Sequence, residues 1–144
     1  MKRLYNFNNK VKVFLDTDTL PEGVSADEAY KLNGRHVVYA INVPNGMIYI
    51  GYTSDLGQRM VTHGKCGRDY DKKMYSDIRK YGECTFSIIG VFDNQKEAME
   101  YETQMIREYE NKFLKDKFKE MLPLVPVGER DVLLFSKLYN VNKR

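Results

Sequence analysis

The sequence predicts an α+β fold in which a small antiparallel β-sheet is flanked by helices. Three observations predict it: a β-hairpin pattern over residues 37–51, a short amphipathic helix over 53–63, and a longer one over 94–109. The chain has 144 residues, of which 42% are apolar and 12% aromatic. This is enough to build a core for one domain and argues against disorder.

The first 35 residues are expected to form an N-terminal extension. Residues 10–15 alternate in the manner of a strand, and residues 19–23 contain a Pro and a Gly that indicate a turn. Residues 25–28 read Ser-Ala-Asp-Glu, a capping box that opens a short helix ending near residues 33–34.

The hairpin pattern consists of apolar, β-branched and aromatic residues on both sides of Pro44-Asn45-Gly46. Asn-Gly supplies the positive φ angles that a tight turn requires. Tyr39 and Tyr49, ten residues apart, lie on different strands and approach one another if the strands pair symmetrically about Asn45. A buried tyrosine pair is usually part of a core, so this pair alone does not indicate a functional site.

The next segment begins with capping residues: Thr53 or Ser54 can serve as the N-cap, with Asp55 in the first turn. Arg59 adjoins the apolar face of this helix, and His63 follows four residues later on the same side. An Arg and a His beside an apolar face are costly to bury without a partner. Either they hold an anion, or Arg59 is a solvated side chain at the helix edge.

The helix over 94–109 carries an acidic residue where apolar ones are expected. Asn94 as N-cap with Glu97 three positions later gives it a capping-box start. Glu102 falls within the apolar stripe of the helix. A carboxylate there should be paired, protonated or bound to a metal. A structural ion pair with Arg59 is the alternative to a metal site.

The C-terminal region, residues 112–144, is expected to be helical. The preceding helix can continue until Leu122-Pro123 breaks it. Residues 128–139 have the pattern of a final amphipathic helix. We therefore expect a core over 36–111 with short extensions on either side, packed into one compact domain or offering a surface for a homodimer.

Charge and composition narrow the functional class. The net charge of +3 gives no global basic field. No apolar run is long enough to span a membrane and no signal peptide is evident, which predicts a cytoplasmic protein with no membrane partner. Cys66 and Cys84 lack metal-ligand spacing and are expected to be reduced thiols.

Positive charge gathers locally between residues 59 and 80, around a Gly-containing loop predicted over 64–71. Such a cluster suits the backbone of a nucleic acid, although Lys-rich loops are often only soluble surface. The candidate nucleic-acid-binding residues are Lys65, Arg68, Lys72, Lys73, Arg79 and Lys80.

Taken together, the motifs resemble the GIY-YIG nuclease superfamily, and its phage and intron homing-endonuclease-like members in particular. The resemblance rests on Tyr39, on Tyr49-Ile50-Gly51, and on Arg59, His63 and Glu102 at the family's offsets. It spans about residues 36–111, with further matching segments over residues 74–82 and 86–89.

The resemblance implies a hairpin plus a third strand, and a metal-dependent endonuclease that hydrolyses DNA, with RNA not excluded. It implies that Glu102 binds Mg²⁺ or Mn²⁺ and that Arg59 grips the scissile phosphate. Tyr39 would be the general base, Tyr49 would contact the phosphate or orient the water, and His63 would assist proton transfer or contact the phosphate.

The chain departs from the family pattern in two places. Val37 stands where the first motif has Gly. For the family's late Asn, Asn111 is one candidate, while Asn140 and Asn142 lie much further on. Three alternatives stay open: a non-catalytic nucleic-acid-binding module, a nuclease for branched or single-stranded substrates, and a protein-interaction or inhibitor domain.

Overall fold

A computed structural model describes residues 1–5, 11–32, 34–65, 72–121 and 138–140. The strands within these ranges are β1 (Lys2–Tyr5), β2 (Lys12–Asp16), β3 (His36–Asn42), β4 (Ile48–Thr53) and β5 (Glu83–Phe92). The α-helices are α1 (Leu56–Lys65), α2 (Lys72–Tyr81) and α3 (Gln95–Met121). Short 3₁₀ helices cover Thr17–Thr19 and Ala26–Leu32.

The strands form one sheet in the order β1-β2-β5-β3-β4. The α+β fold is confirmed, and the hairpin and third strand form its antiparallel part, β4-β3-β5, with β4 at the edge. The sheet is larger than the sequence pattern suggested, because β1 and β2 of the N-terminal extension add to the free edge of β5. The pairing of β2 with β5 is parallel, which makes the sheet mixed.

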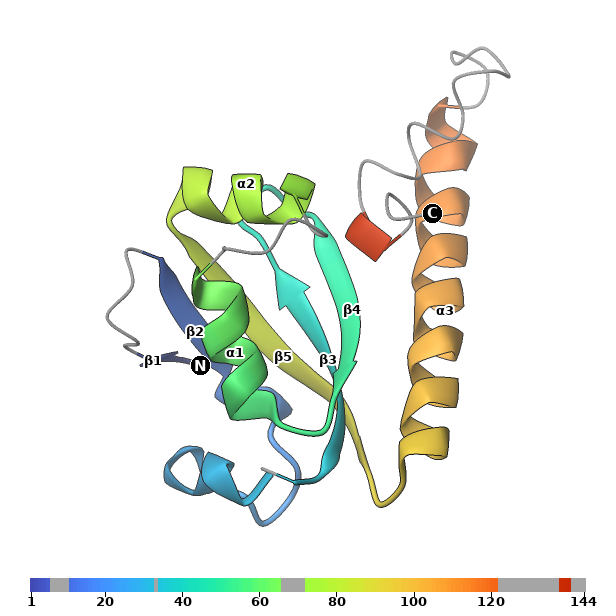
Figure 1. Ribbon diagram of the computed structural model, residues 1–144. Helices are drawn as coiled ribbons and strands as arrows, with labels where there is room; N and C mark the ends of the chain where they lie inside the picture. The colour runs from blue at the N-terminus through green and yellow to red at the C-terminus, as the bar shows by residue number, and fades with distance from the viewer. Residues whose placement is uncertain (6–10, 33, 66–71, 122–137, 141–144) are drawn as a thin grey trace.

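Alternation along β3 divides the core into two layers. Val37, Tyr39 and Ile41 point to the face that α1 and α2 cover. Val38 and Ala40 point to the opposite face, which α3 covers. The edge strand β4 therefore lies between α1 on one side and α3 on the other (Figure 1). We call these the α1/α2 face and the α3 face.

The hairpin turn is built by the residues that predicted it. Gly46 donates its N–H to the carbonyl of Val43 (2.9 Å) and has a φ of 87°. The Asn45 side chain accepts from the N–H of Met47 (2.9 Å). A turn closed by a glycine in the left-handed region is a common three-residue hairpin loop. It sets the register in which β3 and β4 pair symmetrically about Asn45.

The helix starts follow capping chemistry, with one correction. Asp55, and not Thr53 or Ser54, is the N-cap of α1: its carboxylate accepts from the N–H of Gln58 (3.0 Å). Thr53 instead bonds the main chain of Asp55, because β4 runs through Thr53 and leaves Asp55 as the last non-helical residue. A carboxylate oxygen caps as well as a hydroxyl.

The Asn94 cap of α3 is confirmed, since its side chain accepts from the N–H of Glu97 (2.8 Å). The prediction that this helix continues beyond residue 109 is confirmed to Met121. In the N-terminal extension, the predicted strand is β2. The predicted turn closes with Val24 donating to Pro21 (3.0 Å).

The short helix after Ser25 is 3₁₀. The two residues of its predicted capping box are bonded to each other, with Ser25 Oγ donating to the Glu28 carboxylate (2.9 Å).

Of the predicted final helix over 128–139, residues 128–137 lie outside the described ranges; at its end, Leu138 is a bridge residue and residues 139–140 are 3₁₀-helical. Leu138 forms a parallel bridge to Ile48 of β4. The Asn140 side chain accepts from the N–H of Ile50 (2.7 Å) and donates to its carbonyl (2.6 Å). The edge strand offers unpaired peptide groups, and Leu138 and Asn140 lie against them. The segment Leu138–Asn140 therefore closes part of the β4 edge.

A buried carboxylate ties this segment to the rest of the fold. Asp77 of α2 is 7% exposed and accepts from Tyr139 (2.7 Å), Asn45 (3.2 Å) and Lys73 (3.1 Å). Burial raises the pKa of the Tyr139 phenol, and its hydrogen bond to Asp77 raises it further. Tyr139 thus stays protonated as the donor. Asp77 joins the hairpin turn, α2 and the chain end.

Two remaining expectations concern the described residues. Cys84 is a buried free thiol, as expected, and Cys66 lies outside the described residues. Among the helices that the structure describes, none is both long and apolar enough to cross a lipid bilayer.

Replacing Asn140 with Ala should lower the free energy of unfolding by about 2 kcal/mol, because Ile50 is fully buried and would keep an unpaired N–H and C=O. Urea denaturation measures this. Ser76→Ala, at an exposed position of α2, serves as control. A cost for Asn140→Ala no larger than that of Ser76→Ala would show that the edge contact contributes nothing.

Candidate active site

Tyr39 lies at an irregularity of the sheet. Its strand pairs Val38 with Gly90 but Tyr39 with Ile88, so the register against β5 shifts between Val38 and Tyr39. Such bulges increase the local twist and re-aim side chains. The Tyr39 side chain is 1% exposed and packs at 5.3 Å, between ring centroids, from Phe86.

The Tyr39 ring lies directly over Gly51, its partner on β4. A Cβ at position 51 would come within 2.5 Å of both Cζ and Oη of Tyr39 and within 2.9 Å of the Tyr49 ring. The third residue of the Tyr-Ile-Gly motif is thus a glycine because the two rings occupy the space of a side chain.

Tyr39 pairs with Gly51, which stands two residues after Tyr49 on β4. Tyr49 is therefore the diagonal neighbour of Tyr39. The two ring centroids are 6.4 Å apart and the planes are tilted by 45°. The expectation that the two tyrosines approach one another is met. Tyr49 is only half-buried, which makes it the more accessible of the two phenols.

His63 completes the cluster from α1. It is fully buried, and its Nε2 lies 3.2 Å from the Tyr39 hydroxyl. Its Nδ1 lies 2.9 Å from the hydroxyl of Tyr75, on α2. Its ring centroid is 6.0 Å from that of Tyr49. We call Tyr39, Tyr49, His63 and Tyr75 the aromatic cluster. The sequence singled out three of them; Tyr75 lay in a matching segment, but no motif signalled its contact with His63.

Arg59 stands one helical turn before His63 on α1 and is half-buried. It faces a polar hollow of about 320 Å³ at the start of this helix. The residues lining the hollow are Thr53, Ser54, Asp55, Gln58, Arg59 and Thr62. The one carboxylate among them, Asp55, is engaged as the helix cap. Hydroxyl, amide and guanidinium donors suit an anion here.

Glu102 lies on α3, one turn after the fully buried Ala98, and is half-buried. It comes from the α3 face, whereas the aromatic cluster belongs to the α1/α2 face. It does not line the hollow at Arg59. Glu102 and Arg59 therefore approach β4 from helices on opposite sides of the sheet.

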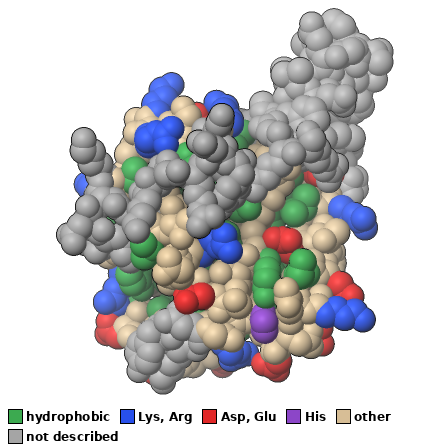
Figure 2. All heavy atoms as spheres, in the orientation of Figure 1, with side chains coloured by type: hydrophobic (Ala, Val, Ile, Leu, Met, Phe, Trp, Pro, Cys, Tyr) green, Lys and Arg blue, Asp and Glu red, His purple; other side chains and the backbone are tan. Residues whose placement is uncertain are grey.

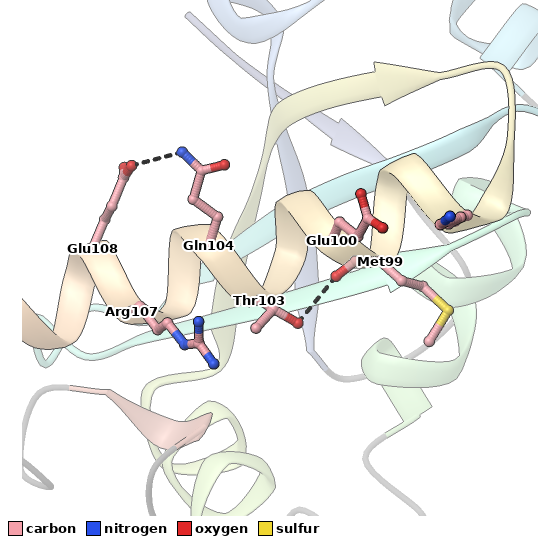
Figure 3. Close-up of a pocket in the computed structure, with 7 residues that line it drawn as sticks. Met99, Glu100, Thr103, Gln104, Arg107 and Glu108 are labelled. Carbon is pink, nitrogen blue, oxygen red and sulfur yellow. Dashed lines mark hydrogen bonds between the residues drawn. The ribbon is translucent and has the colours of Figure 1, made fainter.

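The outward side of α3 presents a different set of side chains (Figure 3). There Gln104 donates to the Glu108 carboxylate (3.0 Å) and Thr103 donates to the carbonyl of Met99 (3.1 Å). These contacts run along the helix itself. The side chains on this outward side line a shallow groove, and Glu102 is not among the residues that line it.

Three asparagines are candidates for the late site position, and Asn142 lies outside the described residues. Asn111 lies within α3, and the structure does not describe its side chain. Asn140 bonds both main-chain groups of Ile50, the middle residue of the Tyr-Ile-Gly motif. The structure thus brings Asn140 to the motif.

Lys and Arg side chains stand on the surface over α2 (Figure 2). Lys73, Arg79 and Lys80 are exposed on this helix, and Lys73 is paired with Asp77. Lys72 begins α2 and Lys65 ends α1. The structure does not describe Arg68 or the predicted loop around it beyond residue 65. The outer side of α2 is thus basic, while its inner side supplies Tyr75.

Gly51→Ala should cost roughly 1–3 kcal/mol of unfolding free energy, because the new methyl group overpacks against the Tyr39 ring. A double-mutant cycle with Tyr39→Val, followed by urea denaturation, isolates that clash. The cost of Gly51→Ala should fall once the Tyr39 ring is absent, and the cost that remains reports the contact with the Tyr49 ring. An equal cost in both backgrounds would mean that the glycine is needed for another reason.

Comparison with known proteins assigns the family. The profile of the GIY-YIG catalytic domain matches residues 35–116, more than half of the chain. A UPF0213 protein of Bacillus licheniformis is 27% identical over 99 residues, which cover 65% of this chain and 94% of that relative. No solved structure matches the chain. The aromatic cluster, Arg59 and Glu102 all lie within the matched region, and the chain belongs to the GIY-YIG catalytic domain family, whose domains are of the nuclease type.

Proposed function

We propose that this protein is an endonuclease that hydrolyses phosphodiester bonds in DNA. The observation that supports this most is the meeting of Tyr39, Tyr49 and His63 in one cluster, with Arg59 one turn away on the same helix as His63. Packing alone does not require a histidine bonded by two phenols. Proton transfer and phosphate binding give these groups a use.

Tyr39 would act as the general base that takes a proton from the attacking water. A phenol has a reference pKa of about 10, so its deprotonated form needs nearby donors or positive charge. Nε2 of His63, 3.2 Å away, is one such group. Tyr49, half-buried beside it, would orient the water or donate to a phosphate oxygen.

Arg59 would bind the scissile phosphate. Its position on a polar hollow places the guanidinium among hydroxyl and amide groups and next to the amino-terminal end of α1. Guanidinium bonds to phosphate are strong and often bidentate. They gain strength as negative charge builds on the phosphorus in the transition state.

Glu102 would hold a divalent cation, Mg²⁺ or Mn²⁺. Among the described residues there is no group of three His, Cys, Asp or Glu that could enclose an ion. A single half-buried carboxylate still fits Mg²⁺, which keeps several waters and uses substrate phosphate oxygens as ligands. When bound, the ion would supply Lewis-acid stabilisation of the phosphoryl charge. The position of Glu102 would determine where the bound ion lies relative to the phosphate.

The basic outer side of α2 would bind the phosphate backbone of the nucleic acid next to the aromatic cluster. Arg79 and Lys80 are exposed there, and Tyr75 on the inner side of the same helix touches His63. Backbone contacts of this kind give affinity without sequence preference. The proposed substrate class is DNA, with a preference for branched or single-stranded DNA as the second candidate.

Glu102→Gln should reduce cleavage of plasmid DNA in Mg²⁺ at least 100-fold, because the amide keeps the shape but loses the charge that binds the ion. Glu100→Gln, at an exposed position of the same helix, should cleave at the parent rate. The measurement is the rate of nicking on agarose gels.

A panel of duplex, flap, junction and single-stranded DNAs in the same assay separates the substrate classes. If the parent and Glu102→Gln retard DNA equally and neither cuts any of these substrates, the protein is a binding module and the enzymatic proposal is wrong. If neither binds, an interaction domain is the better interpretation.

Replacing Arg79 and Lys80 together with Gln should weaken DNA binding equally for all sequences. The dependence of log K on log salt should become less steep by about 0.9 for each phosphate that the variant no longer neutralises. Fluorescence anisotropy at several salt concentrations measures this. Replacing Lys96 and Lys112 together with Gln, at two exposed positions of α3, is the charge-matched control, and an identical slope change in that variant would remove the special role of α2.

A further inference from the structure

We propose that Tyr75 is a positioning residue that fixes the tautomer of His63, so that the Nε2 proton is directed at the Tyr39 hydroxyl oxygen. This inference rests on the proposed role of Tyr39 as general base. It assigns a function to a residue on a second helix that no motif singled out.

The geometry is a hydrogen-bonded chain through one imidazole. Tyr75 Oη lies 2.9 Å from His63 Nδ1, and His63 Nε2 lies 3.2 Å from Tyr39 Oη. All three side chains are at most 1% exposed. The Phe86 ring packs at 5.7 Å, between centroids, from the imidazole. Each of the three groups comes from a different element, β3, α1 or α2, so the chain exists only in the folded protein.

The protonation state of Tyr39 determines which groups donate in the two hydrogen bonds of His63. To accept a proton from water, Tyr39 must first be a phenolate, which has no hydrogen to donate. The contact with Nε2 is then favourable only if Nε2 carries the proton. A neutral imidazole with a proton on Nε2 has a bare Nδ1, which accepts but cannot donate. The Tyr75 hydroxyl, next to Nδ1, is the donor that satisfies it.

The opposite arrangement is the competing possibility. Tyr39 would donate to a bare Nε2, and Nδ1–H would donate to Tyr75. The phenol would then be held as an acid and could not serve as the base. If Tyr75 were only a core aromatic, its ring would matter and its hydroxyl would not. Removing that hydroxyl alone therefore separates a positioning role from packing.

The protein is well suited to a spectroscopic test of the His63 tautomer. It has two histidines, His36 and His63, and ¹⁵N chemical shifts distinguish protonated from bare ring nitrogens. A matched control exists as well, because Nδ1 of His36 lies 2.7 Å from the hydroxyl of Tyr52. Tyr52→Phe removes the same kind of contact at the other histidine.

The experiment is ¹⁵N NMR of histidine-labelled protein, without DNA or metal, for the parent, Tyr75→Phe and Tyr52→Phe. The parent should show His63 protonated on Nε2 and bare on Nδ1. Tyr75→Phe should lower the fraction of that tautomer, and Tyr52→Phe should leave His63 unchanged. A parent with the proton on Nδ1 overturns the proposal without any variant, as does a Tyr75→Phe protein with an unaltered His63 tautomer.

Cleavage links the tautomer to the reaction. In the plasmid assay, Tyr75→Phe should cut about ten-fold more slowly, the equivalent of one missing hydrogen bond, and Tyr52→Phe should cut at the parent rate. A shifted tautomer with an unchanged rate overturns the link to Tyr39. Complete inactivity of the parent would overturn the proposed function, while the NMR result would still decide what Tyr75 does to His63.

Discussion

A histidine that is fully buried between two phenols is the constraint on which the rest of this structure depends. Both ring nitrogens of His63 need partners, and Tyr39 and Tyr75 place a hydroxyl beside each. To reach Nε2, the Tyr39 ring must lie across the neighbouring strand, which is possible only because position 51 has no side chain. The glycine of the motif is therefore part of the arrangement that brings Tyr39 to His63.

The edge strand β4 connects this arrangement to the rest of the proposed site. It supplies Tyr49 and Gly51, and it lies between α1, which carries Arg59, and α3, which carries Glu102. Its outer edge is held by Leu138 and Asn140, and the same chain end is anchored to α2 through Tyr139 and Asp77. Residues far apart in the sequence thus support one short strand. A rigid strand in this place keeps groups from both faces of the sheet in fixed relation, as a preorganised site requires.

Local chemistry made much of the fold predictable. Asn45-Gly46 set the turn, Asn94 capped α3, and the symmetric register brought Tyr39 to Tyr49. The parallel pairing of β2 with β5, the edge contacts of Asn140 and the bond from Tyr75 to His63 could not be predicted. Each depends on segments that meet only through tertiary packing, which leaves no periodicity or spacing in the sequence. The choice of Asp55 as cap was missed because three adjacent residues can all cap, and the end of β4 decides among them.

The central claim is that Tyr39 and Glu102, which come from opposite faces of the sheet, act in one catalytic step. Rates of DNA cleavage in Mg²⁺ for Tyr39→Phe, Glu102→Gln and the double variant test it most directly, because groups that work as a unit are strongly non-additive. The account predicts that the double variant is about as slow as the slower single variant. A double variant whose loss equals the product of the two single losses would show that the two residues act independently, and would contradict it.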